Sequence, residues 1–524
     1  MSVFKLKKIV KTPTVNILIN KIRRYLFPLV VIISIVFPLF ISFRNIANMP
    51  FWFDSARDFL LAQDNLEKFS LIGSPTGIPG LFYGPYWIWL ISLGLIFSRD
   101  PRFVVVYLLI IPYFVVFPLL LSKFTKIFGK EICLMLWILF ITTCINYTTY
   151  LWNPHLSPIL LLLLFNLLIS NQLTPLNKKN SLMICLIGIV NGLILNLHIS
   201  LGIGIFIATF LFIVLEFIVS PSKNLKKYII NRLQVILLWL LGLFITLFPL
   251  MIFELRHDFL QVKIIKETVI KAIFYNMASV GQTGFKQIDI LYKFFIVEPA
   301  ELLKIPANLI YLIYLILFGI IFFSRKKKEI NFNHFEKRLI LFLFLSGLSI
   351  LSLYLSSKNP VWNYHFIGVE IIFLFLIGLI INKIHFLKIL LAVWTSIMLL
   401  SFVSSRITFS SINPHSFSSV ETKKYIVNKI CQDANKSPFA VFAYSPAIYT
   451  FDYDYIFKWQ ASENPFCRPE ENIEKSKFIY LIIPETLEAN KLDFIDYKTP
   501  NSKFATISTW AIEDKTVIIK RVKK

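Results

Sequence analysis

Residues 309–323 read LIYLIYLILFGIIFF and residues 159–168 read ILLLLLFNLL, and neither stretch contains a charged side chain. Apolar runs of this kind are typical of helices that cross a membrane. Of the 524 residues, 56% are hydrophobic and 16% are charged, whereas an ordinary soluble domain carries about 25% charged residues. The sequence therefore predicts an all-α, polytopic membrane protein and excludes a water-soluble enzyme.

The positive charge is concentrated in a few segments of the chain. There are 54 Lys and Arg residues against 30 Asp and Glu, a formal net charge of +24. Basic clusters without acids lie in residues 1–24 and 223–232, and a third lies in residues 325–338, whereas segments 44–85 and 254–305 and the tail from 405 are nearly balanced. Because basic loops stay in the cytoplasm, we predict a protein of the cytoplasmic (inner) membrane. Its N-terminus is then inside, its C-terminus is outside, and the excess charge requires no nucleic-acid partner.

Twelve apolar segments can be drawn between residues 25 and 404, and the first of them, 25–43, is expected to be a signal anchor. An even number of crossings cannot join an inside N-terminus to an outside C-terminus. Either one segment does not cross or a run such as 131–152 splits in two, so we predict 11–13 helices. We expect the irregularity in 86–152, where Pro101, Pro112 and Pro118 interrupt the pattern. The side on which Lys123 and Lys130 lie stays open.

Three parts are therefore predicted: a basic N-terminus (1–24), a transmembrane module (25–404) and an exported tail (405–524). From about residue 418 the tail has the composition of a small soluble α/β domain, with a helix-like stretch at 420–431 and strand-like stretches at 440–444, 478–483 and 516–521. Cys431 and Cys467 lie in this tail, and one disulfide or two free thiols remain equal alternatives.

The first candidate site follows the first span directly. Asp54 and Asp58 are four residues apart and so lie on one face of a helix-compatible stretch, 54–66. A partly desolvated carboxylate binds a proton more tightly and suits a general base, and Arg57 could bind an anionic group. The alternative is that all three are ordinary polar residues of a surface helix.

Two further sets of polar residues lie at span ends that we predict to be exported. His155 separates two apolar runs and His198 interrupts another; each could bind phosphate or sugar, or be a packing residue of a membrane helix. Glu254, Arg256 and His257 follow a span directly, and they could bind a phosphate through Arg256 or anchor the chain at the interface.

Several common motifs are missing from the sequence. It contains no Gly-rich ATP loop, no His-Glu-x-x-His zinc motif and no Gly-x-Ser-x-Gly elbow. Asp452-Tyr453-Asp454 has the form of a metal-binding pair, but we assign it a structural role. No metal ligand or other cofactor is therefore assigned, and participation of a divalent cation stays open.

Four short motifs resemble those of the GT-C glycosyltransferases: FDSARD at 53–58, GSPTGIPG at 73–80, FYGPY at 82–86 and FELRHD at 253–258. Within that superfamily they look most like bacterial relatives of dolichyl-phosphate-mannose protein mannosyltransferases and lipid A aminoarabinose transferases. The resemblance covers roughly residues 20–400. It implies a GT-C fold within the bilayer and an enzyme that moves a hexosyl or pentosyl unit from a polyprenyl-phosphate donor to a lipid, glycan or protein acceptor on the exported face.

Asp54 matches the acidic residue that acts as base in these families. The mannosyltransferases have an Asp-Glu doublet where this chain has Asp54-Ser55, which leaves open whether Asp58 takes the second role. Arg57 and Arg256 would then bind the donor phosphate, assisted by the two histidines. The alternatives are a flippase or exporter of a lipid-linked saccharide, which should carry charges in mid-span, and an oligosaccharide ligase or polymerase.

Overall fold

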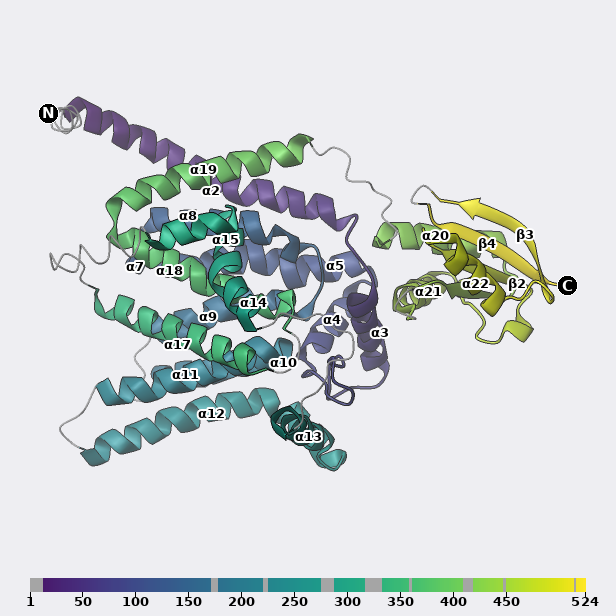
Figure 1. The fold of residues 1–524 in the computed structure, drawn as a ribbon, viewed down its shortest axis with the longest axis horizontal. Coiled ribbons are helices and arrows are strands. Elements are labelled where there is room, and N and C mark those ends of the chain that lie inside the picture. The colour runs from purple at the N-terminus through teal and green to yellow at the C-terminus, as the bar shows by residue number, and fades with distance from the viewer. Residues whose placement is uncertain are drawn as a thin grey trace.

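The computed structural model describes residues 13–170, 178–219, 225–274, 287–315, 332–357, 361–408, 418–445, 449–512 and 515–524. A helical bundle extends to residue 408, and a small domain containing a sheet follows from residue 418. The start of α2 (Pro13–Ile46) and the sheet lie at opposite ends of the long axis of the molecule (Figure 1). The basic residues at 1–12, at 223 and at 325–328 lie outside the described residues.

Eight helical stretches within the described residues are long and apolar enough to cross a membrane, so the chain is a multi-pass membrane protein. They are formed by α2 (Pro13–Ile46), α5 (Pro101–Val105) to α6 (Phe117–Ser122), α8 (Lys130–Cys144) with η3 (Ile145–Thr148), α10 (Lys178–Leu197), α11 (Ile199–Val219), α12 (Leu225–Arg256), α17 (His334–Ser356) and α19 (His385–Thr408). Two shorter helices, α9 (Ser157–Ser170) and α18 (Val369–Lys383), complete the bundle.

Helix α4 (Tyr86–Phe97) accounts for the irregularity expected in 86–152. Its 12 residues rise only about 18 Å, less than the ~30 Å of a bilayer core, so it does not cross. The helix packs instead against α3 (Phe53–Glu67), which lies at the end of the bundle nearest the sheet (Figure 1). The segment at 306–323 is described only up to residue 315.

The prolines of 101–122 do not break this helix, contrary to the sequence pattern. The chain stays helical through two π-helical segments, η1 (Val106–Ile110) and η2 (Pro112–Val116). A wider turn relieves the clash between a proline ring and the preceding turn of helix, and membrane helices tolerate such adjustments.

The structure also places the cluster of Lys123, Lys126 and Lys130, which surrounds α7 (Thr125–Phe128). The amide of Asn382 at the end of α18 donates to the carbonyl oxygen of Ile127 at 2.9 Å. Figure 1 shows α7 near the end of the bundle that carries the N-terminus. These lysines therefore share that end with the start of α2 and the start of α17.

The C-terminal domain has the predicted α/β character. Its helices are α20 (Val420–Ala434), α21 (Phe451–Glu463) and α22 (Glu488–Lys498), and its strands are β1 (Phe439–Ala443), β2 (Phe478–Ile483), β3 (Phe504–Ala511) and β4 (Val517–Lys523). The strand order is β1-β2-β4-β3; β1 and β2 are parallel, and β4 is antiparallel to both of its neighbours. The predicted strands coincide with β1, β2 and β4.

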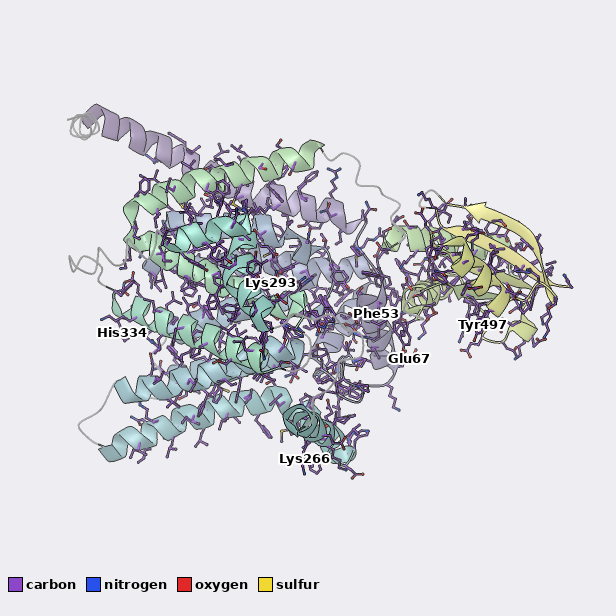
Figure 2. The ribbon with its side chains drawn as sticks, in the orientation of Figure 1. Phe53, Glu67, Lys266, Lys293, His334 and Tyr497 are labelled. Carbon is purple, nitrogen blue, oxygen red and sulfur yellow. A yellow bond between two sulfur atoms is a disulfide. The ribbon has the colours of Figure 1, made fainter. Side chains whose placement is uncertain are left out.

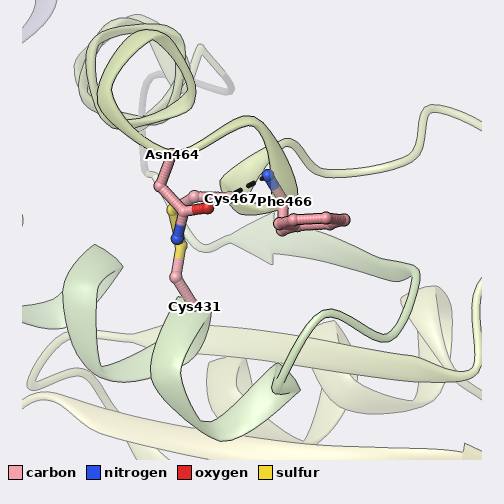
Figure 3. The surroundings of a disulfide bond; sticks show 4 residues. All are labelled: Cys431, Asn464, Phe466 and Cys467. Atoms are coloured by element: carbon pink, nitrogen blue, oxygen red, sulfur yellow. Dashed lines mark hydrogen bonds between the residues drawn. A yellow bond between two sulfur atoms is a disulfide. The ribbon is translucent and has the colours of Figure 1, made fainter.

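Cys431 and Cys467 form a disulfide between α20 and the short turn η7 (Pro465–Cys467), with their Cα atoms 5.1 Å apart (Figure 3). Asn464 caps this turn by accepting the backbone N–H of Phe466 at 3.2 Å. The first of the two alternatives left open by the sequence is therefore the one observed.

The C-terminal domain is docked on the loop that follows α2. The buried ammonium group of Lys423 donates to the carbonyl oxygen of Phe51 at 2.8 Å and pairs with Asp452. The hydroxyl of Tyr455 donates to the carbonyl oxygen of Arg99 at 2.6 Å. Asp452 thus has the structural role predicted for it, and the domain and the first loop form one packed unit.

Candidate functional site

Helix α3 begins with a sharp turn of the chain that carries Asp54. Phe53, its first residue, has φ +29°, a value in the left-handed region that is costly for a bulky side chain. The Phe53 ring lies 5.9 Å from that of Tyr449 and 6.1 Å from that of Phe451, both in the C-terminal domain. Figure 2 shows Phe53 and Glu67 at the end of the bundle that faces this domain. The domain therefore supports the residue directly before Asp54.

Asp58 is buried, and both of its carboxylate oxygens are occupied. One oxygen accepts from the Ser74 hydroxyl at 2.6 Å and from Nη2 of Arg57 at 3.0 Å, and the other accepts from Nε1 of Trp87 at 2.9 Å. Burial raises the pKa of Asp58, and the Arg57 charge opposes this shift. With donors on three sides, Asp58 ties α3 to the 73–85 loop and to α4 and has little capacity left for a substrate.

Asp54 is in a different position. Its side chain is 30% exposed, and among the described residues its ion-pair partner is Arg57, whose Nη1 lies 2.9 Å from one carboxylate oxygen. The guanidinium also binds Asp58, so one cation is shared by two carboxylates. Arg57 has five N–H groups, and one on each Nη remains for another acceptor. Asp54 is therefore the carboxylate of this pair that a substrate can reach.

The Gly/Pro-rich loop folds back on itself to place Ser74 beneath Asp58. The Gly73 N–H donates to the carbonyl oxygen of Tyr83 at 2.9 Å, and the Tyr83 N–H donates to that of Ser74 at 2.9 Å. A Cβ on Gly73 would overlap the carbonyl oxygen of Gly84. The close approach of the two arms therefore requires glycine, and it brings the Tyr83 phenol toward α3.

The charge of Asp54 contributes to the raised pKa of three half-buried phenols. Burial and, to a smaller extent, nearby charges including Asp54 raise the pKa of Tyr83 to about 12. The same two causes raise the pKa of Tyr150, which precedes η4 (Asn153–Leu156), and of Tyr364 in η6 (Asn363–Phe366). All three phenols thus stay protonated and can donate to substrate oxygens. No local motif marked Tyr150, because only the tertiary fold brings it near α3.

His155 and His198 lie near each other, together with His365 of η6, because both of the other rings interact electrostatically with His198. Nδ1 of His155 lies 2.7 Å from the carbonyl oxygen of Tyr150. Nδ1 of His198 lies 3.4 Å from the Ser157 hydroxyl, and its Nε2 is buried without a hydrogen-bond partner within the described part of the chain. The two predicted histidines thus form one buried group, next to a phenol that faces Asp54.

Glu254, Arg256 and His257 lie at the end of α12. Glu254 caps α13 (Leu260–Phe274) by accepting the N–H groups of Gln261 and Val262 at 3.2 and 3.1 Å. The ring of His257 stacks on Phe253 with 4.0 Å between centroids, and Arg256 is exposed. Helix α13, marked by Lys266 in Figure 2, lies toward the same end of the bundle as α3. Glu254 therefore contacts the backbone at the start of α13, and His257 packs on Phe253.

Helix α13 also contacts the loop that carries Tyr83. Oε1 of Gln261 accepts the Phe82 N–H at 2.8 Å, which joins the third predicted set to the first. Within the described ranges of the chain, no group of three or more His, Cys, Asp or Glu side chains is arranged to hold a metal ion.

No protein-family model and no curated protein sequence matches the chain. Among solved structures, it is similar to ArnT from Cupriavidus metallidurans bound to undecaprenyl phosphate, with a TM-score of 0.50 and 11% identity over 94% of this chain and 97% of that one. The Archaeoglobus fulgidus oligosaccharyltransferase in complex with Zn and sulfate gives a TM-score of 0.42 and 12% identity over 86% and 67% of the two chains. The likeness to ArnT shows that the chain shares the polytopic fold of that structure.

Proposed function

We propose that the chain is a membrane glycosyltransferase that moves one sugar from a polyprenyl-phosphate donor to an acceptor on the exported face, with Asp54 as the base. The observation that carries this proposal is the contrast between the two carboxylates of α3. Asp58 is buried with donors on three sides, whereas Asp54 is 30% exposed and oriented by Arg57. The ArnT structure, which contains undecaprenyl phosphate, supports a donor of this kind.

In the proposed reaction, the acceptor hydroxyl donates its hydrogen bond to Asp54. Asp54 takes the proton as the acceptor oxygen bonds to the anomeric carbon. The bond from that carbon to the phosphate oxygen breaks, and polyprenyl phosphate leaves with the electron pair. A single displacement of this kind inverts the anomeric configuration. The free N–H groups of Arg57 and the phenols of Tyr83 and Tyr364 are placed to stabilise the leaving phosphate.

The remaining predicted residues keep supporting roles in this proposal. Asp58 positions Arg57 and the 73–85 loop. His155 and His198 contribute to sugar binding through the buried group near Tyr150, and Arg256, an exposed cation at the end of α12, meets the lipid-linked phosphate.

The disulfide of the C-terminal domain supports an exported site. A disulfide persists in an oxidising compartment and is rare in the cytoplasm. The domain that holds Cys431–Cys467 packs against the loop before α3. An exported domain therefore carries Asp54 to the same side of the membrane.

The test uses membranes containing equal amounts of the native chain, Asp54→Asn or Asp64→Asn, supplied with labelled hexosyl and pentosyl polyprenyl phosphates. Asp64 is a matched control because it lies on the same helix with a side chain that is 63% exposed. We expect the native chain and Asp64→Asn to label one of the lipid, glycan or protein fractions, and Asp54→Asn to lose transfer.

Two other outcomes would contradict the proposal in different ways. Full transfer by Asp54→Asn would exclude Asp54 as the base. No transfer by any of the chains, with lipid-linked saccharide crossing the bilayer, would favour a flippase, and transfer only of preassembled oligosaccharide would favour a ligase.

A further inference from the structure

A cavity of about 540 Å³ lies beside the proposed site, within the range of roughly 300–1,000 Å³ for small-molecule pockets. Its walls come from η3 with Trp152, from η5 (Lys293–Val297) with α15 (Glu298–Leu303), and from η6. Figure 2 shows Lys293 deeper in the bundle than Phe53. Tyr364 and Trp152 both line the cavity, and the Trp152 ring lies 5.9 Å from that of Tyr150 between centroids. The cavity therefore adjoins the segment of the candidate site that carries Tyr150 and His155, and the charge of Asp54 contributes to the raised pKa of Tyr364.

The polar wall of the cavity is a charged group that the sequence did not mark. The ammonium of Lys293 lies 3.1 Å from a carboxylate oxygen of Glu298 and 3.0 Å from one of Glu301. The side chains of Lys293 and Glu298 are only 8% and 10% exposed. One cation shared by two carboxylates leaves a formal charge of −1, which repels a phosphate. The carboxylates keep free lone pairs that can accept from hydroxyl groups.

Aromatic side chains also line the cavity. Trp152 and Tyr364 lie with ring centroids 5.3 Å apart, inclined at 58°, and Tyr147 and Trp362 also line the space. The faces of such rings carry partial negative charge, so they attract the slightly positive C–H groups on one face of a sugar ring. A polyprenyl chain would cover the charged side chains of Lys293 and Glu298 without offering them a further hydrogen bond, which is unfavourable. A sugar ring can donate hydrogen bonds to the carboxylates through the hydroxyls on its edge and pack on the aromatic rings through the C–H groups on its face.

We propose that this cavity binds the sugar ring of a substrate, with Glu298 accepting from its hydroxyl groups and Trp152 and Tyr364 packing on its apolar face. The inference rests on the proposed function, which supplies a sugar at Asp54. The ring belongs either to the donor or to a glycan acceptor, and the two share the same chemistry.

The proposal is tested first by binding without turnover. Methyl glycosides of hexoses and pentoses are added to the purified full-length chain in detergent, and binding is followed by saturation-transfer NMR. Glu298→Gln and Trp152→Leu are each expected to weaken glycoside binding about tenfold or more. Trp152→Phe keeps an aromatic ring, so its affinity for glycosides should stay within about threefold of the native affinity. This comparison separates loss of the ring from loss of the fold.

Glu336→Gln is the matched control. Glu336 is a buried carboxylate paired with Lys383 at 2.7 Å, and its helix α17 starts at the far end of the bundle, where Figure 2 labels His334. We expect this variant to bind glycosides as the native chain does. Equal binding by the native chain and the two cavity variants, or no binding of any glycoside by the native chain, would overturn the proposal.

Transfer kinetics then identify the source of the ring. A KM for the donor raised about tenfold in Glu298→Gln, with kcat changed less, would assign the ring to the donor, and the same change in the KM for the acceptor would assign it to the acceptor. Unchanged KM values for both substrates would contradict the proposal. Because glycoside binding needs no turnover, failure of the transferase assay and failure of the cavity proposal give different results.

Discussion

Replacing the two carboxylates of α3 by asparagine should have different effects. Asp58→Asn should lower stability, whereas Asp54→Asn should lower activity. In Asp58→Asn the side-chain NH₂ group must face a donor, either Nε1 of Trp87 or the hydroxyl and guanidinium groups on the other side, because donors occupy both oxygens. The change also removes one of the two carboxylates that bind Arg57, and Asp54 remains as the other. A buried donor left without an acceptor costs about 1–3 kcal/mol, so the free energy of unfolding should fall by about that amount.

Asp54→Asn should leave stability almost unchanged and remove activity. Its side chain is 30% exposed and makes one ion pair among the described residues, a contact that is worth at most about 1 kcal/mol near the surface. Loss of a general base lowers the rate about 10²–10⁴-fold. Asp58→Asn therefore tests the contribution to stability, and Asp54→Asn tests the contribution to catalysis, at two positions of one helix.

The assay combines denaturant unfolding of the purified chain in detergent with initial rates of sugar transfer per folded molecule, and Asp64→Asn serves as the control on the same helix. Folded Asp58→Asn should keep its rate within about tenfold of the native rate. Asp58→Asn as stable as the native chain, or Asp54→Asn with the native rate, would refute the assignment of these roles.

Three further predictions concern the C-terminal domain and His365. Lys423→Met should cost about 3 kcal/mol of stability because it leaves Asp452 unpaired, and the double variant with Asp452→Asn should recover part of this loss in a double-mutant cycle. Cys431→Ser should destabilise the C-terminal domain by about 3–4 kcal/mol, since the disulfide to Cys467 spans 36 residues; reductant should have the same effect on native protein and none on the variant. Burial lowers the pKa of His365 to about 4, below its unfolded value of about 6.5. Its contribution to stability is therefore present above pH 6.5 and lost as the pH falls toward 4, and unfolding measured across this window should show a shallower slope in His365→Asn.

The sequence predicted those features that depend on neighbours along the chain. Long apolar runs mark membrane helices and short apolar runs mark the strands of the tail, because each reports local burial. Counting crossings led us to expect an irregularity in 86–152, and the 12-residue helix α4 lies in that segment. Pro112 was misleading, because a π-helical turn accommodates it and a local pattern does not show how a membrane helix adjusts.

The part of the site that could not be predicted consists of contacts between residues far apart in the sequence. Tyr150 and Tyr364 approach Asp54 from other segments of the chain, and Lys293 and Glu298 face aromatic residues of two further segments. No local spacing encodes such distances, since they depend on how the bundle closes.

The sequence alone determined that the chain is a helical membrane protein with an acidic pair after its first span, because hydropathy and helical spacing are local properties. It left Asp54 and Asp58 chemically equivalent. Only the tertiary structure separated them: the 73–85 loop brings Ser74, and α4 brings Trp87, to the oxygens of Asp58 alone. Asp54 keeps an accessible oxygen because these donors cannot reach both carboxylates from one side of α3.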